Sequence, residues 1–277
     1  MKKCLLMFFG LPRTFEECSK NINKNLIDNN KECCEFTIII STDINGKEHD
    51  KWNGKRNRTN YDQTILETKL HSTYKNIKNI LYLSGPLYHY SPFGSKSPTI
   101  IYERLAQLLT HEKNNSYDYY IFSRMDIKLI QPIKLSDYTN KFSMITRGPN
   151  KGGGGMFYIR DWDYMWIGCE KSFNLWCINM LKFGYTMKSN KESKTSYLEL
   201  LHDNKYICNT VENYNDISIE DMLKNGSKYN ALLGSRPQNE TAKYCSYYVK
   251  LFHRLIILLE QHNCAFEIGK NFTQLSS

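Results

Sequence analysis

The residues with the clearest chemical potential in this 277-residue chain come directly after apolar runs. Gly10, Arg13 and Thr14 follow the apolar run of residues 3–9. A glycine lets a ligand approach the backbone closely, and an arginine beside a helix N-terminus can bind a phosphate. The glycine patterns of dinucleotide-binding and P-loop sites are absent here. We therefore predict a phosphate-binding turn, with an ordinary strand–helix turn as the alternative.

A second pair of charged residues, Arg124 and Asp126, follows the hydrophobic run of residues 119–122. A carboxylate at the end of a strand can hold Mg²⁺ or Mn²⁺, which in turn bridges a diphosphate. Arg124 could then bind either Asp126 or a phosphate. The alternative is a buried Arg–Asp pair that merely ends the strand.

Asp43 comes just after another apolar run, residues 35–41. An acidic side chain in that place can accept hydrogen bonds from a ribose hydroxyl or a base N–H. Because Asp43 also begins an Asp-Ile-Asn-Gly sequence, it fits a simple turn equally well.

Asp161 and Asp163 lie among aromatic residues, Trp162 and Trp166, after the glycine tract of residues 151–155. Aromatic rings stack on the apolar faces of sugars, while carboxylates bind the hydroxyls. Asp163 is also a candidate general base for an acceptor hydroxyl. The alternatives are a β-turn before a core strand and, for the glycines, a mobile loop near an acceptor.

The elements that must position these residues alternate between strand-like and helix-like patterns. Short apolar runs without alternation predict strands buried on both faces, and apolar residues at helical spacing predict helices. The expected strands are residues 3–9, 35–41, 77–83, 117–123, 127–130, 142–146, 156–159 and 163–168. The expected helices are residues 14–29 (with a capping box at Thr14), 61–74, 99–111, 171–183, 195–203 and 244–262.

This alternation predicts an α/β fold with a mainly parallel, Rossmann-like sheet and helices on both faces. The length fits a single domain, with a nucleotide-binding half (1–147), an acceptor-side half (148–211) and a C-terminal helical extension (212–277). In such a sheet, ligands bind at the carboxyl ends of the strands, which is where the candidate residues fall.

Composition narrows the function classes. The net charge of +9 invites either nucleic acid or an anionic ligand, but the lysines are spread along an Asn-rich chain, so part of the charge fits compositional drift. Nine cysteines without a C-x-x-C pattern favour reduced thiols in a cytoplasmic protein. No apolar run is long enough for a transmembrane segment, and residues 4–11 fit a first strand better than a signal peptide.

Three short motifs in this order resemble those of GT-A-fold glycosyltransferases from bacterial surface-polysaccharide loci and giant DNA viruses. They are the Gly-x-x-Arg-Thr-Phe of residues 10–15, the Arg-x-Asp of residues 124–126, and Asp163 followed by Gly168. The resemblance implies a nucleotide-sugar donor, a glycan or other hydroxyl acceptor, and Mn²⁺ or Mg²⁺ at Asp126. One departure is that Arg124 stands where an Asp-x-Asp motif has its first aspartate.

These observations predict a glycosyltransferase, in the host cytoplasm if the protein is viral. Arg13 would bind the diphosphate, Asp43 the nucleoside, Asp126 the metal and Asp163 the acceptor or the donor sugar. Two alternatives remain: a non-catalytic module of the same fold that binds a glycan or nucleotide, which the Arg124 departure favours, and a basic nucleic-acid-binding protein. We expect no nucleic-acid partner.

Overall fold

The computed structural model describes the two ends of the chain and part of its middle. The described residues are 1–10, 12, 14–42, 62–82, 104–105, 108–109, 111–112, 114–147, 165–173, 175–176, 255 and 258–275. All structural statements below concern these residues.

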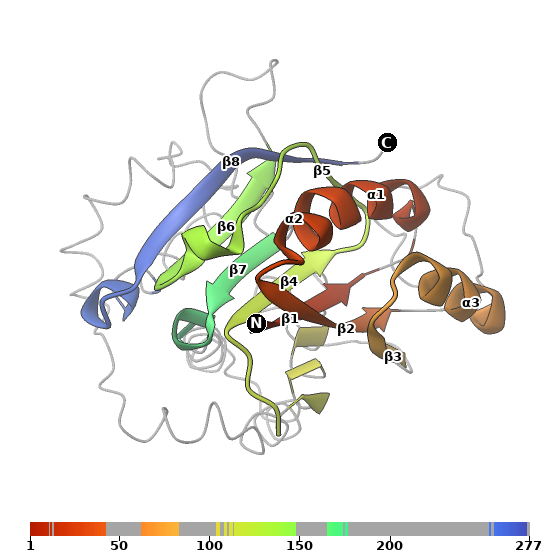
Figure 1. Cartoon of the computed structure of the whole chain (residues 1–277), viewed down its shortest axis with the longest axis horizontal. Coiled ribbons are helices and arrows are strands. Elements are labelled where there is room, and N and C mark those ends of the chain that lie inside the picture. The colour runs from red at the N-terminus through yellow and green to blue at the C-terminus, as the bar shows by residue number, and fades with distance from the viewer. Residues whose placement is uncertain are drawn as a thin grey trace, which may run out of the picture.

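The described strands form one eight-stranded sheet in the order β3-β2-β1-β4-β7-β6-β8-β5 (Figure 1). The first four of these are mutually parallel: β3 (Ile77–Tyr82), β2 (Cys34–Thr42), β1 (Lys2–Phe9) and β4 (Tyr119–Arg124). The other half is mixed and contains β7 (Met165–Cys169), β6 (Lys141–Arg147), β8 (Ala265–Leu275) and β5 (Ile127–Leu129). There β7 is antiparallel to both β4 and β6, β8 is parallel to β6, and β5 is antiparallel to β8.

The central strands are buried on both faces. All six residues from Cys4 to Phe9 are at most 4% exposed, and Ile38, Ile39 and Ile40 of β2 are at most 2% exposed. Strands covered on both sides need apolar side chains at every position, which explains the unbroken apolar runs. The prediction of an α/β fold with a mainly parallel sheet is confirmed.

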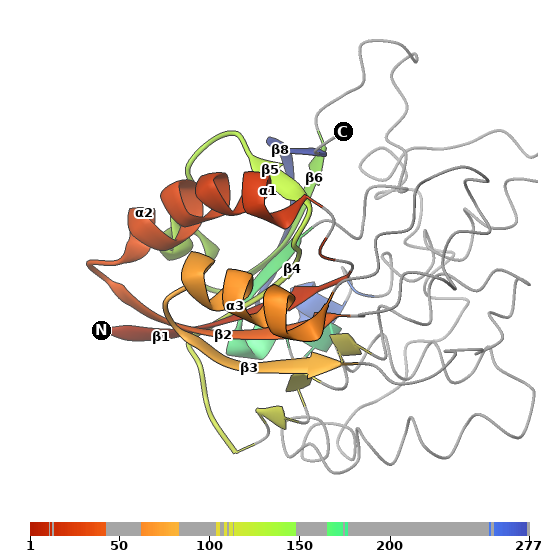
Figure 2. The same cartoon turned by 90° about the vertical axis from the view of Figure 1, so that its right-hand side faces the viewer.

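One face of the parallel half is covered by helices from the first part of the chain (Figure 2). The first helix begins as α1 (Phe15–Ile22), continues through the π-helical turn η1 (Asn23–Ile27) and ends as α2 (Asp28–Asn30). The second is α3 (Gln63–Thr73), where the Asp62 carboxylate accepts a hydrogen bond from Ile65 N at 3.0 Å. Asp62 therefore caps α3.

Thr14 takes the N-cap position of α1, but its side chain makes no capping hydrogen bond. Its backbone angles are φ −116° and ψ 26°, outside the extended conformation that usually lets an N-cap hydroxyl reach the first free amides. The prediction of a capping box at Thr14 is therefore wrong. Its Oγ1 instead lies 3.8 Å from Cys18 Sγ, one turn further along the helix.

Asparagines in the second half of the first helix attach it to the last residue of β5 and to the chain that follows β5. Asn25 donates to Leu129 O, and Asn30 donates to Ile133 O at 2.7 Å and accepts from Leu135 N at 2.8 Å. Both asparagines are buried. Some of the chain's high Asn content is therefore structural.

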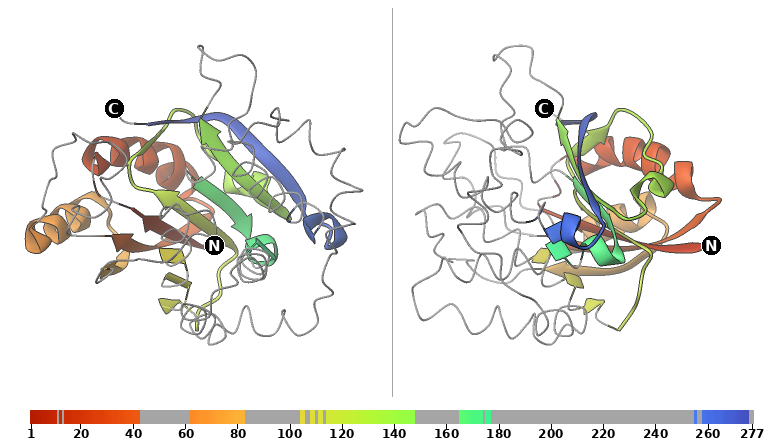
Figure 3. Two further views of the ribbon diagram at one scale, coloured as in Figure 1. Left: turned by 180° about the vertical axis from the view of Figure 1, so that it is seen from behind. Right: turned by 90° about the vertical axis from the view of Figure 1, so that its left-hand side faces the viewer.

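The opposite face of the sheet carries a layer of aromatic rings. Phe122 of β4 stacks between Phe9 and Trp166, with ring centroids 4.1 and 5.0 Å away. Trp176 and Phe173, from the helical residues after β7, pack on the same layer. Figure 3 shows this helical segment on the side of the sheet away from α1, so helices cover both faces as expected.

The end of the chain differs from the prediction. Residues 258–261 are helical as expected for the helix of residues 244–262, but the C-terminal extension is not only helical, because residues 265–275 form β8, a strand that was not predicted. β8 lies inside the sheet, between β6 and β5. β8 pairs with β5, and β5 in turn contacts α1 (Figure 1). The mixed half of the sheet is therefore also joined to the helix layer.

Within the described part of the chain, no helix combines the length and apolar character that a bilayer crossing requires.

Candidate functional site

The order of the parallel strands creates a switch point between β1 and β4. From β1 the chain moves to β2 and β3 on one side, and then returns to place β4 on the other side of β1. In open α/β sheets a ligand-binding crevice forms outside the carboxyl ends of the strands where the order reverses. Phe9 and Arg124 are paired across these two strands, so the residues that follow them leave the sheet together.

Gly10 is the first residue after β1, and its backbone is held in place by β2. Gly10 N donates to Ser41 O at 3.1 Å, and Thr42 Oγ1 donates to Gly10 O at 2.8 Å. Its φ is +101°, a conformation that residues with a side chain rarely adopt. An added Cβ would meet no atom within 4 Å, so the backbone angle, and not lack of space, favours glycine.

Arg124 and Asp126 form a two-bond ion pair at the end of β4. Arg124 Nε donates to Asp126 Oδ1 at 2.7 Å, and Nη2 donates to Oδ2 at 2.8 Å. Met125 between them is fully buried in the core. Met125 and Asp126 form a bend between β4 and β5, so the chain turns here and the two charged side chains meet beside the buried Met125. We call Gly10, Arg124 and Asp126 the switch-point site.

The ion pair bears directly on the predicted metal. A hard cation such as Mg²⁺ or Mn²⁺ binds through carboxylate oxygens, but each oxygen of Asp126 already accepts a hydrogen bond from Arg124. The Asp126 side chain is also only 11% exposed. Within the described ranges, no group of three His, Cys, Asp or Glu residues could hold a metal ion. The arrangement of the described residues therefore does not fit a metal at Asp126.

Arg104 also lies at this edge, although no sequence motif predicts a role for it. It belongs to the helical residues that follow β3 in the chain, is 2% exposed, and its Nη1 lies 3.4 Å from Ser41 Oγ near the end of β2. A signal was present in the sequence: Arg104 lies four residues before Leu108 on the apolar face of the predicted helix. A charged residue on such a face is unusual enough to mark a special position.

The structure places only some of the predicted site residues. Gly10, Arg124 and Asp126 come together at the switch point, and Thr14 lies at the start of α1. The predictions for Arg13, Asp43, Asp161 and Asp163 fall outside the described residues.

Trp166, one of the aromatic residues near the two aspartates, is placed and corrects one expectation. It is 1% exposed and lies 4.2 Å, between ring centroids, from Trp176. Trp166 is therefore a core residue and not a surface on which a sugar could stack.

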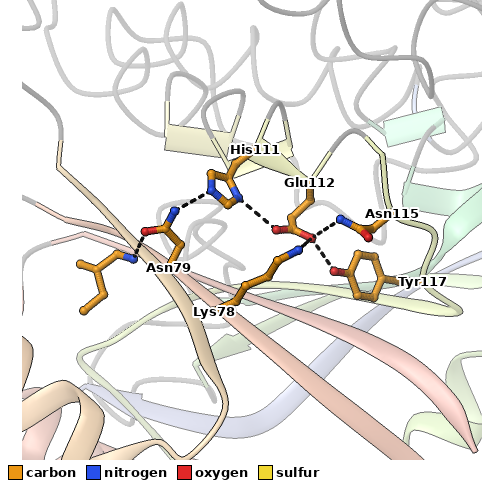
Figure 4. Close-up of polar contacts among 7 residues, drawn as sticks. Lys78, Asn79, His111, Glu112, Asn115 and Tyr117 are labelled. Carbon is orange, nitrogen blue, oxygen red and sulfur yellow. Dashed lines mark hydrogen bonds and ion pairs between the residues drawn. The ribbon is translucent and has the colours of Figure 1, made fainter.

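A second polar cluster lies at the opposite, amino-terminal edge of the sheet (Figure 4). Glu112, 2% exposed, accepts from Lys78 Nζ at 2.9 Å, from Asn115 Nδ2 at 3.1 Å and from the Tyr117 hydroxyl, and its Oε1 lies 3.0 Å from His111 Nδ1. Burial alone would raise the pKa of Glu112, but the hydrogen bonds from Tyr117, Lys78 and His111 outweigh it and lower the pKa. The carboxylate is fully satisfied, so the cluster joins β3 to the segment before β4 and serves stability.

Comparison with protein-family models finds no match for the chain, and a search of curated proteins finds none either.

Proposed function

We propose that the chain is a glycosyltransferase that moves a sugar from a nucleotide-sugar donor to a hydroxyl acceptor. One observation carries the proposal: a glycine with positive φ and an arginine–aspartate pair meet where the strand order reverses. This is where an open α/β sheet binds nucleotides. The order of the three sequence motifs supports the same conclusion.

In the proposed reaction, the acceptor oxygen bonds to the anomeric carbon of the donor sugar. The bond between that carbon and the diphosphate oxygen breaks, and its electron pair leaves with the nucleoside diphosphate. The acceptor proton passes to a base, for which Asp163 remains the predicted candidate. Arg124 donates hydrogen bonds to the diphosphate as negative charge develops on it, and the Gly10 turn lets that group approach the backbone.

No step here depends on the metal that the resemblance implies, because the ion pair of Arg124 and Asp126 does not fit a metal at Asp126. Arg13 for the diphosphate and Asp43 for the nucleoside stay predictions, as does a location in the cytoplasm.

A non-catalytic module of the same fold is the second candidate. The observation that favours it is the engagement of both Asp126 oxygens by Arg124, which leaves an incomplete version of the expected metal motif. Such a module would bind a nucleotide or glycan but transfer no sugar.

A donor screen separates the two. The purified chain is mixed with UDP- and GDP-linked sugars, with and without Mn²⁺, and both the melting temperature and the release of nucleoside diphosphate are measured. An enzyme is expected to be stabilised by at least one donor and to hydrolyse it slowly. Stabilisation without release in the presence of varied glycan acceptors supports the binding module, and no response to any nucleotide sugar contradicts both.

A further inference from the structure

We propose that Asp126 is a positioning residue for Arg124 and not a metal ligand, so that a nucleoside diphosphate binds at the switch-point site without a divalent ion there. This inference rests on the proposed function and concerns how the same site contacts the diphosphate of the donor.

The ion pair has the geometry of an orienting contact. A guanidinium is planar, and its Nε and one terminal nitrogen match the two oxygens of a carboxylate. Arg124 uses both of these nitrogens on Asp126, at 2.7 and 2.8 Å. Two parallel bonds fix the plane and direction of the guanidinium, where a single bond would let it rotate.

Burial reinforces this restraint. The side chain of Arg124 is 22% exposed and that of Asp126 is 11% exposed. A partly buried carboxylate that lost its cation would be left as a poorly solvated charge, so the pair resists opening. A divalent ion on the same oxygens would have to displace the guanidinium or share the carboxylate with a nearby positive charge. The pair is neutral as a whole, so it supplies a guanidinium of fixed direction at the end of β4 and no excess positive charge.

A guanidinium held in one direction suits a diphosphate. The phosphate oxygens accept hydrogen bonds from guanidinium N–H groups, and an arginine that is already in place needs no cation from solution to donate them. The neighbouring turn at Gly10 adds backbone that a phosphate can approach. This arrangement predicts donor binding that is insensitive to chelators.

The test measures UDP and GDP binding to the full-length chain by calorimetry, in EDTA and in Mn²⁺. The wild type is expected to bind one of them with the same affinity in both buffers. Asp126→Asn, nearly isosteric, is expected to weaken binding about tenfold, the effect of misplacing one charged contact. Arg124→Gln is expected to weaken it more, and Arg124→Lys is expected to recover only part, because an ammonium cannot make the two-bond contact.

A double-mutant cycle gives a readout that a general loss of structure would not produce. If Asp126 acts only through Arg124, then Asp126→Asn has no further effect on affinity in the Arg124→Gln background. Asp118→Asn, directly before the opposite end of β4, is the matched control and is expected to leave binding unchanged. Melting curves verify that each variant folds.

Each result decides the matter. Equal affinity in EDTA and Mn²⁺ with a non-additive cycle supports the proposal. Binding that needs Mn²⁺, together with loss of Mn²⁺ affinity in Asp126→Asn by electron paramagnetic resonance, overturns it and leaves the proposed function standing. Failure of both nucleotides to bind under either condition overturns the inference and the proposed function together.

Discussion

The Glu112 cluster allows the most detailed prediction, because its buried carboxylate has four identified partners. Glu112→Gln keeps the shape of the side chain but removes its charge. The bonds from Tyr117, Asn115 and His111 then lose about 1 kcal/mol each, the difference between charged and neutral hydrogen bonds. The bond from Lys78, whose side chain is 42% exposed, contributes about 0.5 kcal/mol at most.

We therefore expect Glu112→Gln to lower the free energy of unfolding by about 3 kcal/mol at pH 7. The assay is urea unfolding followed by tryptophan fluorescence, with equal m-values for the two proteins. Glu16→Gln is the control: its ion pair with Lys69 is short, at 2.6 Å, but more than half exposed, so the expected loss is below about 0.5 kcal/mol.

The difference in the free energy of unfolding between the wild type and Glu112→Gln should also depend on pH. Because the pKa of Glu112 is lower in the folded state, its contribution is present above the ordinary glutamate value of 4.5 and is lost as the pH falls through the folded value. The wild type and Glu112→Gln should thus converge in stability well below pH 4.5. Equal stability at pH 7, or a difference that persists undiminished in strong acid, would refute the structural role of the carboxylate.

Three further substitutions test the backbone conformation at Gly10 and two side-chain contacts of the helices. Gly10→Ala should lower the free energy of unfolding in urea by about 1–2 kcal/mol, because a φ of +101° is unfavourable for alanine although the added Cβ has room. An unchanged free energy of unfolding would contradict the positive φ. Asn30→Ala should cost about 2–4 kcal/mol and speed hydrogen exchange at Leu135, whose amide loses its acceptor; unchanged exchange there would contradict the bond. Asp62→Ala should cost about 1 kcal/mol by uncapping α3, and a neutral result would contradict the cap.

The central strands were the most predictable elements. β1, β2 and β4 are buried on both faces, so their sequences are continuous apolar runs that any periodicity analysis detects. The parallel arrangement brings the carboxyl ends of these strands to one edge, and for this reason the sequence alone groups Gly10, Arg124 and Asp126.

β8 could not be predicted in the same way. Gly269, Lys270 and Asn271 interrupt its apolar pattern, and its partner strand is more than a hundred residues away, with Lys141 opposite Ala265. Pairing at that distance depends on the whole sheet and leaves little local signal.

Side-chain partners were equally hard to predict. Arg124 could have bound either Asp126 or a phosphate, because spacing alone does not decide between them. Thr14 had the right residue type for a cap, but its backbone angles are unsuitable. Arg104 belongs to no motif, and the helical periodicity of its segment is carried by the apolar residues around it.

Hydrogen exchange with bound nucleotide tests the central claim most directly. The chain is labelled with and without saturating UDP, and in parallel GDP, and exchange is followed by mass spectrometry. If the donor binds at the switch point, protection is expected in peptides that cover residues 8–10 and 123–127, and none in those that cover residues 114–118 at the opposite edge. Protection confined to the opposite edge, or no protection with either nucleotide, would contradict the proposed site.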